Sequence, residues 1–278
     1  MKLSIFHTTT YHYSAPLRHT VQMLHLWPTS GPWQTVAFWG LKAPATVYGG
    51  RGGMPDGFGN RVHQFSLSVP AGASPVLGAQ IEANGIVHTH GLSLVNDLPH
   101  MPHPSLYLRS TPMAEPHPRL AAWATQVLGS KTAGQPACAA SALALAQAVG
   151  EQVRYRKGST DVETTALEAF DWGLGVCQDQ AHVLVAVCRS LGWPARYVSG
   201  YFYAADEPDL ASHAWADVCV DVTTRQWLSL DVTHACPTDE RHVRLASGTD
   251  YSTCPPIKGV RRGGGQERLA VNINLTAL

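Results

Sequence analysis

Residues 175–182 read GVCQDQAH, and they carry a cysteine from a glycine-containing loop into the first turn of a predicted helix. Apolar residues continue around most of the circumference as far as Leu191, so this helix is predicted to be buried. Gly192 and Pro194 then end it. A thiol at a helix start faces unpaired backbone N–H groups and the positive end of the helix dipole, which favour the thiolate. Position alone leaves Cys177 either a reactive nucleophile or a small buried apolar residue.

Two downstream residues complete a pattern with Cys177. His213 lies in ASHAWADV, residues 211–218, and Asp231 lies in WLSLDVTHA, residues 227–235. A cysteine, a histidine and an aspartate can supply a nucleophile, a base that removes its proton, and a carboxylate that orients the base. His213 alone would more often be a structural strand residue. The three together indicate a catalytic site.

These segments resemble the three sequence blocks of the transglutaminase-like superfamily. The matching blocks are GVCQDQAHVLVAVCRSLGWPARYVSGY, residues 175–201, and the two quoted above. They are most similar to the bacterial branch, whose members are often described as candidate cysteine proteases. The resemblance covers residues 150–275 and extends more weakly to the N-terminus. It implies a papain-like or transglutaminase-like core, in which Cys177, His213 and Asp231 form the catalytic triad.

Composition excludes several other classes of protein. The chain has 278 residues, with 20 Lys and Arg against 20 Asp and Glu, so nothing indicates a nucleic-acid or polybasic membrane partner. Charged residues make up 14%, with 25 Gly and 19 Pro, which is typical of a turn-rich enzyme that contains β-structure. There is no apolar run of signal-peptide or membrane-span length, so we expect a cytoplasmic location.

The six cysteines form no CxxC pair, which argues against a structural zinc site and, in a reducing compartment, predicts free thiols. His88 and His90 could chelate a metal ion, but no third ligand at a fixed spacing accompanies them. We therefore expect neither a metal nor a cofactor.

The strand and helix signals divide the chain into two parts. Short strands broken by Gly and Pro run to about residue 109, as in an antiparallel sandwich or partial barrel. This region resembles the N-terminal β-domain of the same bacterial branch. Six prolines between residues 99 and 118 predict a linker. Helices are expected at residues 118–128, 137–149 and 165–170, and strands at residues 195–203, 213–222, 226–232 and 269–274. The prediction is an α+β chain with a β-domain at residues 1–110 and a catalytic core at residues 111–278.

The strands that carry His213 and Asp231 predict an indirect pairing. If they form a hairpin, the two residues face each other only when the turn is centred on residue 222, whereas the polar residues 223–225 suggest a later centre. We therefore expect a β-bulge or a diagonal contact. Alternation places Trp215 on the same face as His213.

Four further residues are expected to support the triad or form walls of the cleft. Asp179 is favoured as a carboxylate that the helix dipole stabilises, and Trp215 as a core aromatic residue. Gln178 follows the cysteine directly, and Tyr251 echoes the family near the site.

The resemblance implies acyl transfer on an amide bond of a peptide or protein through a thioester. Water as acceptor would make the protein a protease or amidase, which we favour, and an amine would make it a protein-glutamine transglutaminase. A non-catalytic binding module that keeps the fold is a third alternative. No acidic calcium-binding loop is visible, so calcium gating is not indicated. The sequence does not define the oligomeric state.

Overall fold

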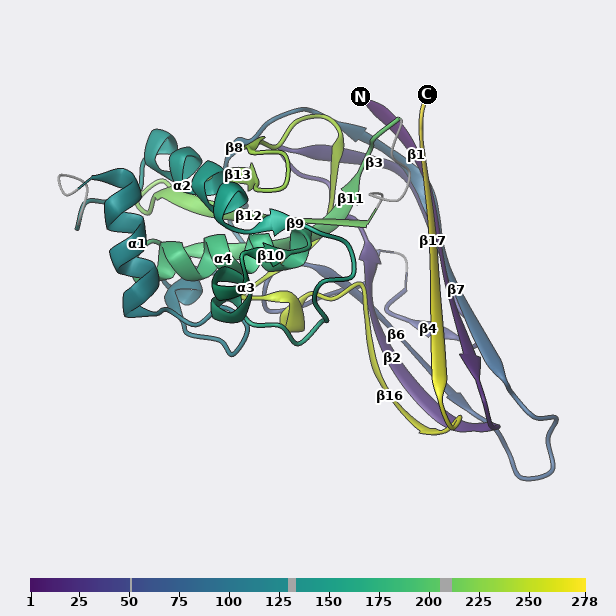
Figure 1. Cartoon of the computed structure of the whole chain (residues 1–278). Helices are drawn as coiled ribbons and strands as arrows, with labels where there is room; N and C mark the ends of the chain where they lie inside the picture. Colours follow the sequence, from purple (N-terminus) through teal and green to yellow (C-terminus); the bar gives the residue numbers. More distant parts are fainter. Residues whose placement is uncertain (51, 130–133, 206–211) are drawn as a thin grey trace.

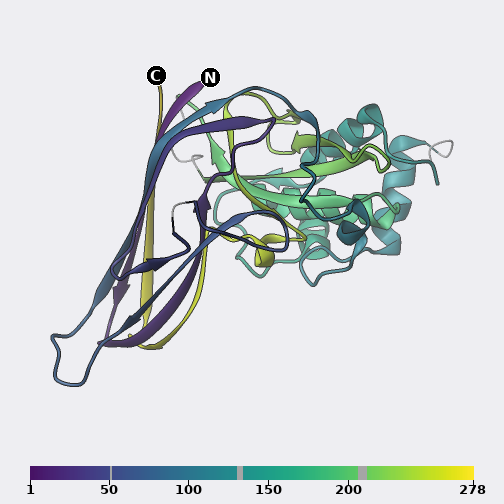
Figure 2. The same cartoon turned by 180° about the vertical axis from the view of Figure 1, so that it is seen from behind.

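The computed structural model describes residues 1–50, 52–129, 134–205 and 212–278, and they form a long β-sandwich joined to a helix-covered sheet (Figure 1). The helices lie on one side of the central sheet, and from behind its strands stand in front of them (Figure 2). The predicted α+β architecture, a sandwich followed by a transglutaminase-like core, is confirmed.

Two antiparallel sheets build the sandwich, and inner strands such as β1 and β7 alternate buried and more exposed residues. In β1, Leu3 and Ile5 face the core while Phe6 faces solvent. The first sheet has the order β17-β1-β7-β3, with bounds Glu267–Ala277, Lys2–Tyr13, Gly78–Thr89 and Gln34–Lys42. The second has the order β16-β2-β6-β4, with β5 also on β6, and its bounds are Ile257–Gly263, Leu17–Trp27, Arg61–Ser68, Val47–Tyr48 and Met54–Pro55.

The last two strands of the chain belong to the sandwich. β17 pairs with β1 from Leu3↔Ala277 to Tyr13↔Glu267, and β16 pairs with β2. Both termini therefore lie side by side at one end of the sandwich (Figure 1). The expected core at residues 111–278 included β16 and β17, whereas both strands belong to the sandwich. A single boundary at residue 110 therefore does not separate the two parts. Local patterning cannot reveal which distant strand an edge strand will join.

The core contains a six-stranded sheet of order β14-β13-β12-β11-β15, with β8 paired to β13. Their bounds are β8 Leu94–Asn96, β11 Ala195–Phe202, β12 Ser212–Asp221, β13 Gln226–Asp231, β14 Cys236–Pro237 and β15 His242–Gly248. β8 lies before residue 110, so it too crosses the expected boundary.

Helices α2 and α4 pack on one face of this sheet and bury its aliphatic residues, and two further helices of the described residues, α1 and α3, pack on α4. Their bounds are α1 Pro118–Leu128, α2 Ala139–Gln152, α3 Ala166–Trp172 and α4 Cys177–Ser190. Val183 and Val187 of α4 share one apolar cluster with Ala216 and Val218 of β12. The pair β9 Arg154–Tyr155 and β10 Leu174–Gly175 leads into α4, and the short 3-10 helices η1 and η4 span Pro104–Leu108 and Tyr251–Thr253. The predicted linker thus contains η1, and the predicted helices occur within three residues of their expected bounds. Among the described residues, no helix is long and apolar enough to cross a lipid bilayer.

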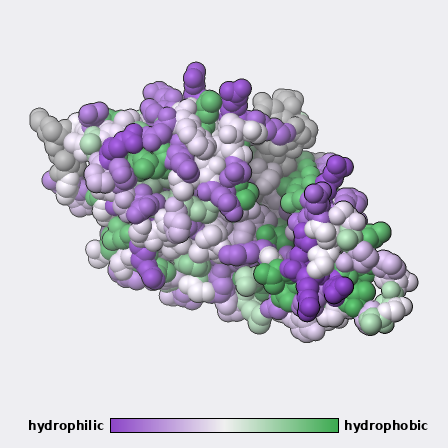
Figure 3. Space-filling model, turned by 60° about the horizontal axis from the view of Figure 1, so that its bottom comes forward, coloured by the Kyte–Doolittle hydropathy of each residue, from purple (hydrophilic) through white to green (hydrophobic). Residues whose placement is uncertain are grey.

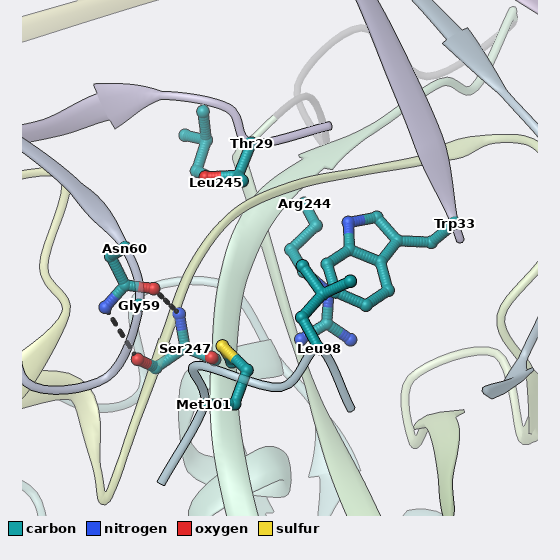
Figure 4. Close-up of a pocket in the computed structure, with 9 residues that line it drawn as sticks. All are labelled: Thr29, Trp33, Gly59, Asn60, Leu98, Met101, Arg244, Leu245 and Ser247. Carbon is teal, nitrogen blue, oxygen red and sulfur yellow. Dashed lines mark hydrogen bonds between the residues drawn. The ribbon is translucent and has the colours of Figure 1, made fainter. Parts of the chain in front are cut away.

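Side-chain amides of the sandwich close the outer edge of the central sheet. At the edge strand β15, Gln34 bonds both backbone groups of Arg244, at 2.9 and 2.8 Å. Asn60 does the same for Ser247, at 2.8 Å for each bond (Figure 4). Beside these contacts Trp33, Met101 and Leu245 help to line a cavity of about 20 Å³, which has room for about one water molecule (Figure 4). The two parts of the molecule are therefore hydrogen-bonded together beside a cavity of the size of a water molecule.

Apolar and charged residues are interspersed over the sandwich on the face shown in Figure 3. Exposed large apolar side chains of the sandwich strands include Phe6, Phe38, Val260, Leu269 and Val271. Scattered residues of this kind are normal on a protein surface.

Candidate active site

Cys177 is the first residue of α4, and the local sequence explains why the helix begins there. Val176 is the extended N-cap residue, and its N–H donates to the Asp179 carboxylate at 2.7 Å. Thr160 donates to the same oxygen at 2.6 Å. Gly175 is required because a Cβ there would lie 2.7 Å from the Asp179 Cβ. The loop therefore presents the thiol, partly exposed, at the positive end of a buried helix.

Asp179 has the favoured structural role, since it caps the helix that carries Cys177. Burial raises the pKa of this carboxyl, and the bonds from Thr160 and Val176 oppose that effect. Its remaining oxygen, Oδ1, is buried without a hydrogen bond within the described part of the chain.

His213 and Asp231 meet diagonally across two neighbouring strands. The register pairs Ala216 with Leu230, which centres the hairpin later than residue 222, and a bulge follows at Cys219/Asp221. His213 Nε2 nevertheless donates to Asp231 Oδ2 at 2.8 Å. The predicted diagonal contact and the predicted bulge both occur. Side chains bridge the offset because both residues lie on the same face of the sheet.

The electrostatics of His213 connect it to both other residues of the predicted triad. Burial alone would lower the pKa of His213, but the Asp231 carboxylate and the Cys177 sulfur raise it to about 10. Its Nδ1 is buried and has no hydrogen-bond partner among the described residues. Since Nε2 is committed to Asp231, Nδ1 is the ring nitrogen left to exchange a proton with Cys177.

Two histidines that sequence reasoning missed also bind Asp231. His234 Nδ1 and His242 Nε2 lie 2.7 and 2.9 Å from Asp231 Oδ2. Burial would raise the pKa of Asp231, but the hydrogen bonds from His213, His234 and His242 outweigh it and hold that pKa far below its ordinary value. The available signal was the position of His234, three residues beyond the aspartate in the quoted block. No sequence signal pointed to His242, whose contact with Asp231 appears only in the tertiary structure.

The cluster also has the spacing of a metal site. Ligand atoms of His213, Asp231 and His242 lie within 4.8 Å of one another. The ring nitrogens that face the carboxylate sit at hydrogen-bond distances from it, so N–H donors account for the spacing. A metal ion would have to displace those protons.

The remaining predicted residues lie around the triad in different ways. Trp215 is a buried core aromatic, 6.3 Å from the His213 ring centre, and Gly200 makes room for its ring. Tyr251 and Cys177 both pack against the small apolar cluster that includes Tyr197. The Tyr251 N–H donates to His182 Nε2 at 3.0 Å, so His182 is a packing residue. Gln178 donates to Val162 O at 3.4 Å and is partly exposed.

Known proteins match both parts of the chain. Residues 122–232 match the Transglutaminase-like superfamily, and residues 3–81 match the Bacterial transglutaminase-like N-terminal region. An uncharacterized protein of Mycobacterium leprae is 27% identical over 294 residues, covering 100% of this chain and 99% of that protein. An uncharacterized protein of Mycobacterium tuberculosis is 35% identical over 125 residues, covering 42% of this chain and 40% of that protein.

A solved structure shares the whole fold. It is a candidate cysteine protease from Cytophaga hutchinsonii, with a TM-score of 0.76 and 19% identity, covering 100% of this chain and 91% of that one. At this identity the likeness concerns the fold alone. The two family matches occur in the expected order: residues 122–232 are similar to the transglutaminase-like superfamily, and residues 3–81 are similar to the bacterial transglutaminase-like N-terminal region.

Proposed function

We propose that this protein is a cysteine-dependent acyl-transfer enzyme that hydrolyses amide bonds in peptides or proteins. Cys177 is the nucleophile, His213 the general base and acid, and Asp231 the carboxylate that orients the imidazole. The observation that carries the proposal is the 2.8 Å bond from His213 Nε2 to Asp231, which leaves Nδ1 for the thiol.

The proposed reaction has two steps. His213 Nδ1 takes the thiol proton, and the Cys177 sulfur attacks the amide carbonyl to form a tetrahedral intermediate. The C–N bond then breaks, His213 returns its proton to the departing amine, and a thioester remains. Water, deprotonated by His213, attacks the thioester and releases the acid and the free thiol. A Cys177 N–H in the first helical turn has no intrahelical acceptor, so it is available to bind the oxyanion.

The test measures the rate of Cys177 alkylation by iodoacetamide between pH 5 and 9, mapped by peptide mass. The wild type is compared with His213→Ala. We expect fast labelling below pH 7 in the wild type and a large loss in the variant, because the imidazolium stabilises the thiolate. Exposed Cys138 is the internal control, since hydrogen bonds from Ser141 lower its pKa independently of His213.

Amide substrates are then screened with and without a primary amine, which separates hydrolysis from transglutamination. Equal labelling of Cys177 and the buried cysteines, unchanged in His213→Ala, would contradict the proposal and favour a binding module.

A further inference from the structure

One carboxylate oxygen at the site lies within hydrogen-bond distance of three imidazole rings, although one ring would suffice to orient the base. Asp231 Oδ2 lies 2.8 Å from His213 Nε2, 2.7 Å from His234 Nδ1 and 2.9 Å from His242 Nε2. Asp231 itself is fully buried. Two of these three contacts are not used by the reaction as proposed.

The hydrogen bonds on the far side of His242 set its tautomer. The backbone N–H of Asp239 donates to His242 Nδ1 at 3.1 Å, so in the neutral ring Nε2 carries the proton that points at Asp231. The Asp239 carboxylate lies 3.1 Å from the same nitrogen and is itself held by Arg241 at 2.6 Å. His242 thus lies between two carboxylates, with Nε2 facing Asp231 and Nδ1 facing Asp239.

His234 approaches Asp231 from the turn after β13. Its backbone N–H reaches Asp231 Oδ1 at 3.2 Å, while its ring reaches Oδ2, so it contacts both carboxylate oxygens. Phe202 stacks on His234 at 4.3 Å and also contacts His242 at 4.9 Å. This aromatic ring holds both imidazoles in place.

We infer that His242 and His234 are positioning residues, which hold the Asp231 carboxylate ionised and aimed at His213. The inference rests on the proposed function. A buried carboxylate beside a single imidazolium tends to take its proton, because burial penalises both charges. Two additional N–H donors stabilise the carboxylate, so the proton stays on His213. They also restrict rotation of the carboxylate, which keeps Oδ2 opposite His213 Nε2.

The charged and titratable groups around this cluster come from several elements. Asp239 and Arg241 precede β15, which begins with His242. Burial and then the Asp231 charge raise the pKa of Cys236 of β14, and the Cys177 sulfur of α4 helps to raise the pKa of His213. Asp239, His242, Asp231 and His213 therefore lie in one series of contacts that begins at a partly exposed carboxylate and ends at the ring beside Cys177.

The test compares variants that keep the N–H donor with variants that remove it. His242→Gln places an amide donor near the Nε2 position, and His242→Leu removes the donor at similar volume. His234→Asn and His234→Leu form the corresponding pair at Nδ1. The readout is the rate of Cys177 alkylation between pH 5 and 9, with Cys138 as internal control and a thermal melt to verify folding.

We expect His242→Leu to lower the alkylation rate of Cys177 at pH 7 by about tenfold or more, as loss of a charge-assisted hydrogen bond implies. Its pH profile should shift upward. His242→Gln should stay within about threefold of wild type, because the donor remains. His234→Leu should show a smaller loss, since His234 is 26% exposed and water can replace its ring.

A folded His242→Leu protein that labels as fast as wild type, or faster, would overturn the inference. Faster labelling would mean that His242 merely competes with His213 for the carboxylate. Equal loss in the Gln and Leu variants would also overturn it, because the donor would then not be the relevant feature. If His242→Leu does not fold, the His234 pair decides. Slow labelling of Cys177 in the wild type would instead reject the proposed function itself.

Discussion

Two buried ionisable residues, His213 and Asp217, lie on the same face of β12. Asp217 accepts from Arg196 of β11 and Arg244 of β15, at 2.8 Å each. Burial would raise the pKa of Asp217, but the two guanidinium groups lower it to about 2. The Arg196 guanidinium also lies 4.1 Å from the centre of the Trp227 ring. These contacts tie together the strands that hold His213 and Asp231.

Replacing Asp217 by Asn should destabilise the fold strongly, because both arginines lose a buried counter-charge. We expect the free energy of unfolding to fall by about 3–5 kcal/mol in urea denaturation. Asp221→Asn is the matched control, since Asp221 is partly exposed on the same strand near the hairpin turn, where it accepts from Thr223 and Thr224. The control should change by about 0.5 kcal/mol or less. Equal effects at both positions would refute this interpretation.

Replacing Asp231 by Asn should remove the charge that raises the pKa of His213. The imidazolium would then lose its proton at lower pH and stop stabilising the thiolate, so fast Cys177 labelling should begin only at higher pH than in the wild type. At pH 7 we expect a loss of about tenfold to a hundredfold in the alkylation rate, as for loss of a buried charged hydrogen bond. Stopped-flow alkylation across pH would measure it. An unchanged profile would mean that Asp231 does not act on the base.

At the scale of elements, β15 is an edge strand that another molecule could pair with if it were bare. Its outward backbone groups at Arg244 and Ser247 are instead bonded by the side chains of Gln34 and Asn60. The same contacts fix the sandwich to the core. Asn60 is held in turn by Asp56, in the turn that Gly59 permits with φ +82°.

Asn60→Ala should therefore leave two buried backbone groups of Ser247 unpaired. The expected loss is about 2–6 kcal/mol in the free energy of unfolding, at about 1–3 kcal/mol for each of the two unsatisfied groups. Asn96→Ala provides the comparison, because Asn96 is exposed and makes one bond to Thr224 O. Chemical denaturation of both variants would test the difference, and a loss below 1 kcal/mol at Asn60 would show that water satisfies the strand edge.

At the scale of the whole molecule, the chain closes on itself because both sheets of the sandwich need a C-terminal strand. Truncation after Gln266 removes β17 and exposes the edge of β1 along its eleven paired positions. We expect loss of the cooperative thermal transition or of soluble protein, whereas removal of Leu278 alone should change little. A truncated protein with a wild-type melting profile would contradict this view of the sandwich.

Acid should also destabilise the folded chain. Burial lowers the pKa of His7 to about 4 from the ordinary 6.5, and His7 bonds Tyr201 and Thr9. A lowered pKa means that the unfolded chain binds the proton more tightly, so this contribution is complete above pH 6.5 and is lost as the pH falls toward 4. At 1.36 kcal/mol per pKa unit it is about 3 kcal/mol. Melting temperatures from pH 7 to 4 should fall less steeply in His7→Gln, but not in His12→Gln, since His12 is exposed.

The sequence was sufficient for every feature that depends on local pattern. The glycine, the cysteine and the apolar run that follows predict the start of α4, because caps and periodicity act within a few residues. Alternation along β12 and β13 placed His213 with Trp215 and Asp231 with Trp227, and the expected position of the turn predicted a bulge or a diagonal contact. The quoted blocks also resembled the transglutaminase-like superfamily, which residues 122–232 match. These features together define the Cys177, His213 and Asp231 site as a prediction.

Only the tertiary structure decided which distant segments meet. His242 of β15 meets Asp231 of β13 although β12 and β11 lie between these two strands in the sheet. Phe202 packs against the rings of both His234 and His242. Gln34 and Asn60 reach β15 from the sandwich, and the last strands pair with the first. None of these contacts leaves a local signal, since hydrogen-bonding side chains and edge strands can be satisfied by many partners. Packing of the complete chain selects one.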